Sequence, residues 1–251
     1  MTMKNPTPAA FRQARAFTIV ETMLSVSIGL IVILGILVFT LSLWKTFYSD
    51  FNRLNINDDL RRFTETMETD AAFANTFYIY DINVVTNTGT FGPIPTTGTT
   101  DNFLTPGQSG DLVLLVSILT ATSGTTTVDQ IIAYYHDGTN ASTGPMYRYS
   151  TGKGLGIAGT TNIYKLYHNN IETPLRNMIT NKQIFMPSAR VVGVATNSFG
   201  TAATHPNLFY FLWRPGTGNG AFKVQSQIKE QQNSQTVLAI DTYNFTIWPR
   251  S

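Results

Sequence analysis

The chain has 251 residues, of which 43% are hydrophobic and only 13% are charged, against about 25% charged residues in a typical soluble domain. It contains no cysteine, which excludes disulfide bonds, thiolate metal sites and cysteine nucleophiles. Of its 17 basic residues, Lys4, Arg12 and Arg15 precede residue 17, which leaves 14 basic against 15 acidic residues in the rest of the chain. This balance excludes a broadly basic surface for nucleic acid.

The first 44 residues divide into a polar leader and a long apolar segment. Residues 1–16 carry basic side chains and no acid, whereas residues 17–44 carry a single charge, Glu21. The uncharged run from Thr22 to Trp44 exceeds the roughly 20 residues that a transmembrane helix needs. Trp44 and Lys45 at its end suit a membrane–water interface. We therefore predict a membrane-spanning helix over residues 17–44.

Residues 45–77 continue as an amphipathic helix. No proline interrupts the chain between Phe17 and Phe77, and a single helix over that range would be roughly 90 Å long. The apolar residues recur at steps of three and four, the spacing of one helix face: Trp44, Phe47, Phe51, Leu54, Leu60, Phe63, Met67, Ala71 and Ala74. Part of so long a helix must be buried by something outside its own domain.

From residue 78 onward the pattern is that of short strands, so that residues 78–251 are predicted to form a β-rich globular head. Each run is rich in β-branched and aromatic residues and is bounded by turn-forming residues. The fold class is therefore α+β, with a long N-terminal α-helix packed on an antiparallel sheet. The predicted strands are Tyr78–Val85, Leu112–Leu119, Val128–Tyr135, Met146–Tyr149, Ile163–Tyr167, Arg190–Val194, Leu208–Trp213 and Thr242–Trp248, with Asn87–Gly110 as a long loop and Gln225–Gln235 as a polar helix or loop.

The junction between the leader and the apolar segment reads Arg15-Ala16-Phe17-Thr18-Ile19-Val20-Glu21. A basic leader ends in a small residue, an aromatic residue begins the apolar run, and one acid follows four positions later. A carboxylate inside an apolar segment is costly, and it is normally a functional residue with a partner.

This junction resembles the prepilin N-terminus of type IV pilins and type II secretion pseudopilins. The resemblance implies that a prepilin peptidase cuts between Ala16 and Phe17 and that Phe17 is then N-methylated. The family usually carries Gly at the position of Ala16. The resemblance also implies that Glu21 of one subunit pairs with the new α-amino group of Phe17 on a neighbour during assembly. Such a buried charge pair favours one axial register of the two helices.

A looser resemblance points to the minor pilins of the PilW and J types. The run Leu60–Ala71 looks like the end of their long helix, and Ile132–Tyr135 with Met146–Tyr149 looks like one of their hairpins. The family's frequent mid-helix proline is absent, and Gly29 and Gly35 occupy that region. The sequence leaves a major pilin as the alternative to a minor one. It does not decide between a pilus and a secretion pseudopilus, nor between adhesion, motility and DNA uptake as the role of the filament.

The resemblance implies a set of partners and a location. The partners are the prepilin peptidase, other pilin subunits, the inner-membrane assembly platform and membrane lipid; nucleic acid is not expected. The chain would cross the inner membrane once before assembly and lie in an extracytoplasmic filament afterwards. We expect no catalytic residue, no metal and no cofactor.

Three other interpretations compete with this one. A secretory signal peptide has an apolar region of only about 7–15 residues, followed by its small-residue cleavage site; here the apolar run is longer and Ala16 precedes it. A plain signal anchor with an incidental Glu21 would give a membrane-tethered binding protein that does not polymerise. A membrane-anchored enzyme would require a catalytic constellation in the head.

Two further motifs have simple structural explanations. Gly154–Gly159 fits a dinucleotide-binding pattern, but a strand rather than a helix is predicted after it, so we interpret it as a glycine loop. Tyr134, Tyr135, Tyr147 and Tyr149, with Arg148 and Lys153, resemble an aromatic–basic patch for single-stranded nucleic acid; we interpret them as alternating faces of strands.

Overall fold

The computed structural model describes residues 18–82, 84, 106–137, 144–159, 163–187, 189–193, 208–213, 220–230 and 239–249. The fold is α+β, as predicted: a long N-terminal helix followed by antiparallel sheets. The chain divides into two compact units, Met1–Phe51 and Asn52–Ser251, which are described separately.

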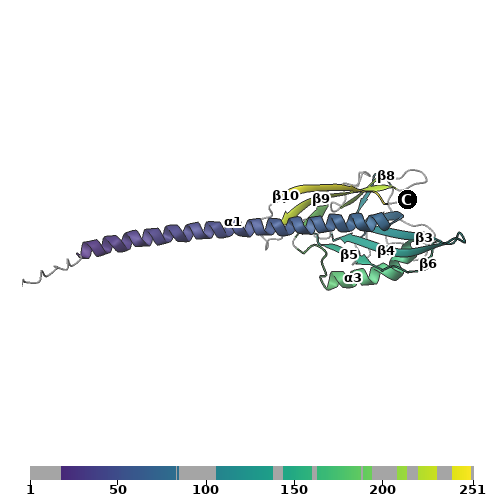
Figure 1. Cartoon of the computed structure of the whole chain (residues 1–251), viewed down its shortest axis with the longest axis horizontal. Helices are drawn as coiled ribbons and strands as arrows, with labels where there is room; N and C mark the ends of the chain where they lie inside the picture. The colour runs from purple at the N-terminus through teal and green to yellow at the C-terminus, as the bar shows by residue number, and fades with distance from the viewer. Residues whose placement is uncertain are drawn as a thin grey trace, which may run out of the picture. The chain divides into compact units, whose positions relative to one another are not determined.

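Helix α1 runs from Ile19 to Phe73 without a break (Figure 1). It ends four residues before the predicted Phe77 because Asn75 leaves the helix to join the sheet. The Asn75 N–H donates to the carbonyl oxygen of Val116 (2.9 Å), and its Oδ1 accepts from the Ile118 N–H (2.5 Å). Strand β1 (Thr76–Tyr80) follows at once.

In the second unit, the predicted apolar face of α1 forms the centre of the head. Its buried apolar residues are spaced by three and four along the helix: Ile56, Leu60, Phe63, Met67 and Ala71. Phe63 makes edge-to-face contacts with Tyr134, Phe185 and Phe245. Propensity alone would leave such a helix marginal, so packing supplies most of its stability.

The strands form two antiparallel sheets. The first has the order β1-β3-β4-β5 with β6 also on β4, and the second has the order β10-β9-β8-β2 with β7 also on β9. Hydrogen bonds of Asp111 connect the sheets where β2 passes into β3. The strands are β1 (Thr76–Tyr80), β2 (Ser109–Gly110), β3 (Leu112–Thr120), β4 (Thr126–His136), β5 (Met146–Ser150), β6 (Ile157–Ala158), β7 (Ala189–Gly193), β8 (Phe209–Trp213), β9 (Ala221–Glu230) and β10 (Ala239–Ile247).

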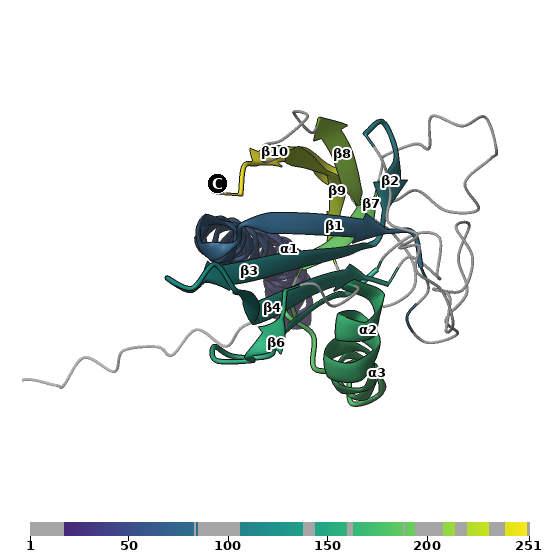
Figure 2. The same ribbon diagram turned by 90° about the vertical axis from the view of Figure 1, so that its right-hand side faces the viewer.

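Alternation along β3 and β4 divides the head into two cores. Val113, Leu115 and Tyr134 point toward α1 and the second sheet. Leu114 and Tyr135 point the other way, toward α2 (Ile163–Tyr167) and α3 (Thr173–Thr180). Figure 2 shows α1 between the two sheets and the shorter helices beneath the first sheet. The first sheet is therefore covered on both faces, which explains its nearly continuous apolar strands.

The prediction of a strand at Ile163–Tyr167 is wrong, because these residues form α2. A π-helical turn, His168–Glu172, joins α2 to α3. Pro174 in the first turn of α3 has no N–H, and its ring would clash with the carbonyl four residues earlier in a regular α-helix. The wider π turn just before it relieves that clash.

The prediction of a polar helix or loop at Gln225–Gln235 is also wrong as far as residue 230, where β9 ends. Phe222, Val224 and Ser226 are buried and alternate with partly exposed residues, which is the period of a strand with one covered face. Most of the predicted loop Asn87–Gly110 lies outside the described residues, but its end forms β2.

Candidate functional site

Glu21 lies in the first turn of α1, on the exposed apolar unit. It is the one acidic or basic residue between Thr18 and Trp44. An 18-residue window within α1 has a mean hydropathy of 2.7 and none of it is buried. This distinguishes the segment from the core helix of a soluble protein and makes α1 long and apolar enough to cross a membrane.

Glu21 and Thr18 form a capping box at the start of α1. The Glu21 N–H donates to Thr18 Oγ1 (3.3 Å), and Glu21 Oε2 accepts from the Thr18 N–H (3.3 Å) and the Thr18 hydroxyl (3.4 Å). The pattern Thr-x-x-Glu before an apolar run predicts such a cap. The resemblance to prepilins assigns Glu21 to assembly alone, so this second role of its side chain is an addition from the structure.

Four of the five other hydroxyl groups of the apolar segment bond to the helix itself. Each side chain donates to a backbone carbonyl three or four residues earlier, at 2.8 Å. These donors are Thr22, Ser25, Ser27 and Thr40. Such internal bonds hide polar groups from an apolar medium, so Glu21 is left as the costly group of this segment.

The predicted processing site is only partly described. Ala16 and Phe17 lie outside the described residues, so cleavage between them and N-methylation of Phe17 stay predictions.

The final turns of the first unit present an exposed aromatic stripe. Trp44, Phe47, Tyr48 and Phe51 recur at steps of three and four, so they share one face of α1, and each is more than half exposed. Within the described residues the protein provides no cover for this stripe. Aromatic side chains of this kind suit a membrane interface or a neighbouring helix.

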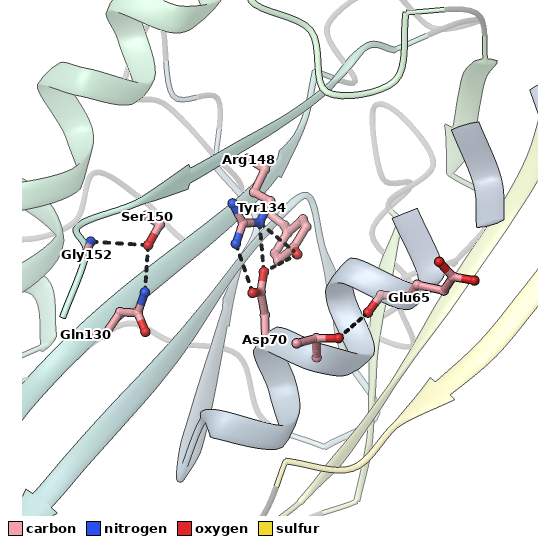
Figure 3. A network of polar contacts seen from close by, with 8 residues as sticks. Glu65, Asp70, Gln130, Tyr134, Arg148, Ser150 and Gly152 are labelled. Atoms are coloured by element: carbon pink, nitrogen blue, oxygen red, sulfur yellow. Dashed lines mark hydrogen bonds and ion pairs between the residues drawn. The ribbon is translucent and has the colours of Figure 1, made fainter. Parts of the chain in front are cut away.

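A network of polar contacts joins α1 to the first sheet, and it was not foreseen from the sequence (Figure 3). Asp70 on α1 accepts two hydrogen bonds from Arg148 on β5, from Nε (2.8 Å) and from Nη2 (2.9 Å). The hydroxyl of Tyr134 on β4 donates to the same carboxylate. A bidentate pair fixes both distance and orientation, so this network sets how α1 lies on the sheet.

Burial and hydrogen bonding keep both Tyr134 and Arg148 of this network protonated. Burial, reinforced by the Asp70 carboxylate, raises the pKa of Tyr134, so its hydroxyl remains a donor. The hydrogen bonds to Asp70, together with Tyr134, raise the pKa of Arg148 despite partial burial. The aspartate is therefore surrounded by donors, as a buried carboxylate requires.

A second buried polar pair connects the two sheets. His136 Nδ1 lies 2.9 Å from Asp111 Oδ1, and both side chains are almost fully buried. The same carboxylate oxygen accepts from the Leu208 N–H (3.2 Å), just before β8. This arrangement joins the end of β4 to the start of β8, and we assign it a structural role.

The proposed aromatic–basic patch does not form an exposed platform. Tyr134 is buried in the core next to α1, Tyr135 and Tyr147 are buried on the opposite face, and Arg148 is paired with Asp70. This confirms the interpretation as alternating strand faces. Lys153 instead lies over the exposed ring of Phe73, 5.0 Å from its centroid.

The glycine-rich motif begins as a loop at Gly154–Gly156, as expected, although the reason given from the sequence is wrong. Helix α2, and not a strand, follows it. However, β6 lies inside the motif and pairs antiparallel with β4, so the chain does not pass directly from strand to loop to helix, as dinucleotide sites require. The Gly154 N–H donates to Asp129 Oδ1 (2.9 Å). In the described part of the chain, no three His, Asp or Glu side chains gather as metal ligands would.

No protein-family model, no curated protein and no solved structure matches this chain. The architecture, a long apolar N-terminal helix packed on an antiparallel sheet, is compatible with that of pilins.

Proposed function

We propose that this protein is a structural subunit of a type IV pilus or related pseudopilus, held first in the membrane and then in a filament by α1. The proposal assigns the chain a role in assembly and no catalysis. Among such subunits we favour a minor pilin, and the partners are the processing peptidase, the assembly platform and other pilins.

The observation that carries the proposal is one carboxylate, Glu21, on the otherwise uncharged part of α1 that precedes Lys45, where an apolar window long enough to cross a membrane has none of its residues buried. Apolar helices attract one another without a preferred register, because any sliding position buries similar area. A carboxylate that must meet a cation in apolar surroundings is satisfied at one register only. An assembly that needs regular spacing gains that spacing from such a residue.

Processing before Phe17 would supply the cation. The α-amino group of the shortened chain is positively charged near neutral pH, and it would lie at the same end of α1 as Glu21. Pairing between neighbouring subunits would then neutralise both groups.

Replacement of Glu21 by glutamine tests the proposal. The amide keeps the size of the side chain and removes its charge. We expect at least a tenfold loss of incorporation into sheared filaments, since an uncompensated partner charge in apolar surroundings costs roughly 3 kcal/mol or more.

Glu68→Gln is the matched control, because Glu68 is an exposed acid on the same helix within the head. Its incorporation should equal that of the wild type. If Glu21→Gln also enters filaments normally, or if no filament contains the protein, the chain is better described as a membrane-tethered binding protein.

A further inference from the structure

One end of the head exposes apolar side chains that its own cores leave uncovered. Phe73, the last residue of α1, is 61% exposed, and Leu119 near the end of β3 is 56% exposed. The Ser117 hydroxyl donates to the carbonyl oxygen of Phe73 (2.8 Å), and Leu119 lies on the same face of β3, two residues further on. Figure 2 shows α1 ending beside β3. The head therefore carries an apolar surface where α1 ends.

Lys153 adds a positive charge to this surface. Its ammonium group lies 5.0 Å from the centroid of the Phe73 ring. The side chain is exposed, and it forms no ion pair with any residue that the structure describes. A lysine held over an aromatic ring has already lost part of its rotamer freedom, so less is lost when it binds. We call Phe73, Leu119 and Lys153 the Lys153 patch.

The glycine-rich loop holds Lys153 in this place. Gly152 and Gly154, on either side of it, have positive φ angles of 76° and 83°, a conformation that glycine adopts at little cost. The Gly152 N–H donates to Ser150 Oγ (3.2 Å; Figure 3), and the Gly154 N–H donates to Asp129 Oδ1 (2.9 Å). The loop that begins the glycine motif thus presents a cation beside an exposed ring.

The aromatic stripe of α1 has the complementary charge. Asp50 follows Phe47 by three residues, which places the two side chains next to each other on the helix surface. It is exposed, it is the only acid between Glu21 and Asp58, and it has no ion-pair partner within the described residues. The stripe combines exposed rings with one carboxylate, and the Lys153 patch combines exposed apolar side chains with one ammonium group.

We propose that the Lys153 patch of one subunit docks on the aromatic stripe of a second copy of this chain, with Lys153 paired to Asp50. The inference rests on the proposed function, because the two surfaces meet in a filament. The contact is heterologous, since two different surfaces of the same protein meet, and such contacts extend into open polymers. Glu21 then sets the register of the helices, and the Lys153–Asp50 pair attaches a head to a neighbouring helix.

The charges favour a second copy over a lipid surface as the occupant. An anionic membrane surface attracts Lys153 but repels Asp50, so it cannot satisfy both groups. A second copy satisfies both charges in one contact and covers exposed apolar side chains on each partner. Because the pair is surrounded by aromatic rings, its attraction is also stronger than it is in bulk water.

Exchange of the two charges tests the pairing. Lys153→Glu and Asp50→Lys should each lower incorporation into sheared filaments by about fivefold or more, because like charges then face each other across the contact. The double variant should recover most of the wild-type incorporation. Lys182→Glu, a reversal at another exposed lysine of the head, should be incorporated normally. A double variant no better than its single variants would overturn the pairing.

Cysteine crosslinking tests whether the contact joins two copies. The chain has no cysteine of its own. Thr46 precedes Asp50 by one turn of α1, and Thr127 lies opposite Leu119 in the register of β3 and β4, so replacing them removes no residue of the proposed contact. Two differently tagged copies, one with Thr46→Cys and the other with Thr127→Cys, should form a mixed disulfide in filaments. The control Asn177→Cys, on α3, should not replace Thr127→Cys.

Three crosslinking outcomes would overturn the inference: no mixed disulfide, an equal yield with Asn177→Cys, or crosslinks from Thr127→Cys to a different protein. Each leaves the proposed function standing if Glu21→Gln is excluded from filaments. Normal incorporation of Glu21→Gln overturns that function instead, whatever the disulfides show. Urea denaturation of Lys153→Glu should match the wild type, because the side chain is exposed, and this separates a docking defect from a folding defect.

Discussion

The two halves of α1 differ in how far they expose side chains of the same kind. Phe47 is 69% exposed and Phe63 is 1% exposed, although both lie on one continuous helix. Around Phe63 the chain folds back and supplies two sheets, whereas around Phe47 it supplies nothing within the described residues. The comparison teaches that the head completes its own core, while the apolar N-terminal half of α1 stays exposed, as the proposed place in a membrane and then in a filament would require.

The largest expected effect is on where the protein resides. Removal of residues 1–51 should move it from the membrane fraction to the soluble fraction, because the deleted helix accounts for roughly 10 kcal/mol of insertion free energy. Cell fractionation with detergent extraction measures this. Retention of the shortened chain in the membrane would show that the head has an anchor of its own, and it would contradict the division of α1 into a membrane half and a head half.

The next effect contrasts the two phenylalanines directly. Phe63→Ala should lower the free energy of unfolding of the head by about 3–5 kcal/mol, because it removes a buried ring that contacts three others. Phe47→Ala should leave that free energy unchanged and instead weaken filament incorporation. Urea denaturation of both variants, together with filament counts, tests the pair. Equal destabilisation by the two would contradict the division of α1.

A third contrast concerns two arginine–carboxylate pairs, one between α1 and β5 and the other within α1. Arg148, with its side chain 26% exposed, is bonded to Asp70, so Arg148→Ala should destabilise the head by about 2–3 kcal/mol, somewhat less than a fully buried pair. Arg61 forms an exposed pair with Glu65, and Arg61→Ala should be without measurable effect. The urea concentration at half-unfolding measures the loss of stability of each variant, provided that the dependence of the unfolding free energy on urea concentration is unchanged. A loss for Arg61→Ala as large as that for Arg148→Ala would overturn it.

The smallest effect is a dependence on alkaline pH that belongs to the head. Burial raises the pKa of both Tyr134 and Tyr135, with help from Asp70 and Asp137 respectively. A phenol with a raised pKa in the folded state stays protonated there, while the unfolded chain ionises near pH 10. Stability should therefore be constant to about pH 9 and then fall, by at most about 1.4 kcal/mol per pH unit for each tyrosine.

Tyr135→Phe checks this assignment. The variant should show a shallower fall between about pH 10 and 11 than the wild type, measured as urea midpoints at each pH. An identical slope would mean that Tyr135 is not held protonated by the fold.

The sequence predicted the elements whose pattern is long and periodic. Helix α1 and most strands were found because their apolar spacing extends over many residues. Ile163–Tyr167 was misassigned because three of its five residues are aromatic or β-branched, as in a strand. Only the longer spacing through Leu166, Ile171 and Leu175 places one helical face on the sheet. Strand β9 was missed because its alternation of buried and exposed residues begins at Phe222, before the polar run Gln225–Gln235.

The candidate site was predictable where its signal is local. Glu21 is conspicuous because the residues around it are apolar, and Thr18 stands at capping-box spacing from it. The Asp70–Arg148 pair joins residues 78 positions apart, and nothing in either local sequence indicates the other. Such long-range pairs depend on how strands are ordered in the sheet, which short patterns do not specify.

The most direct test of the central claim is the intact mass of the mature protein purified from membranes or filaments. The account predicts a chain that begins at Phe17 and carries an added methyl group on its α-amine, the group available to Glu21 of a neighbour. A mature chain that still begins at Met1, or one that begins after Trp44, would contradict it.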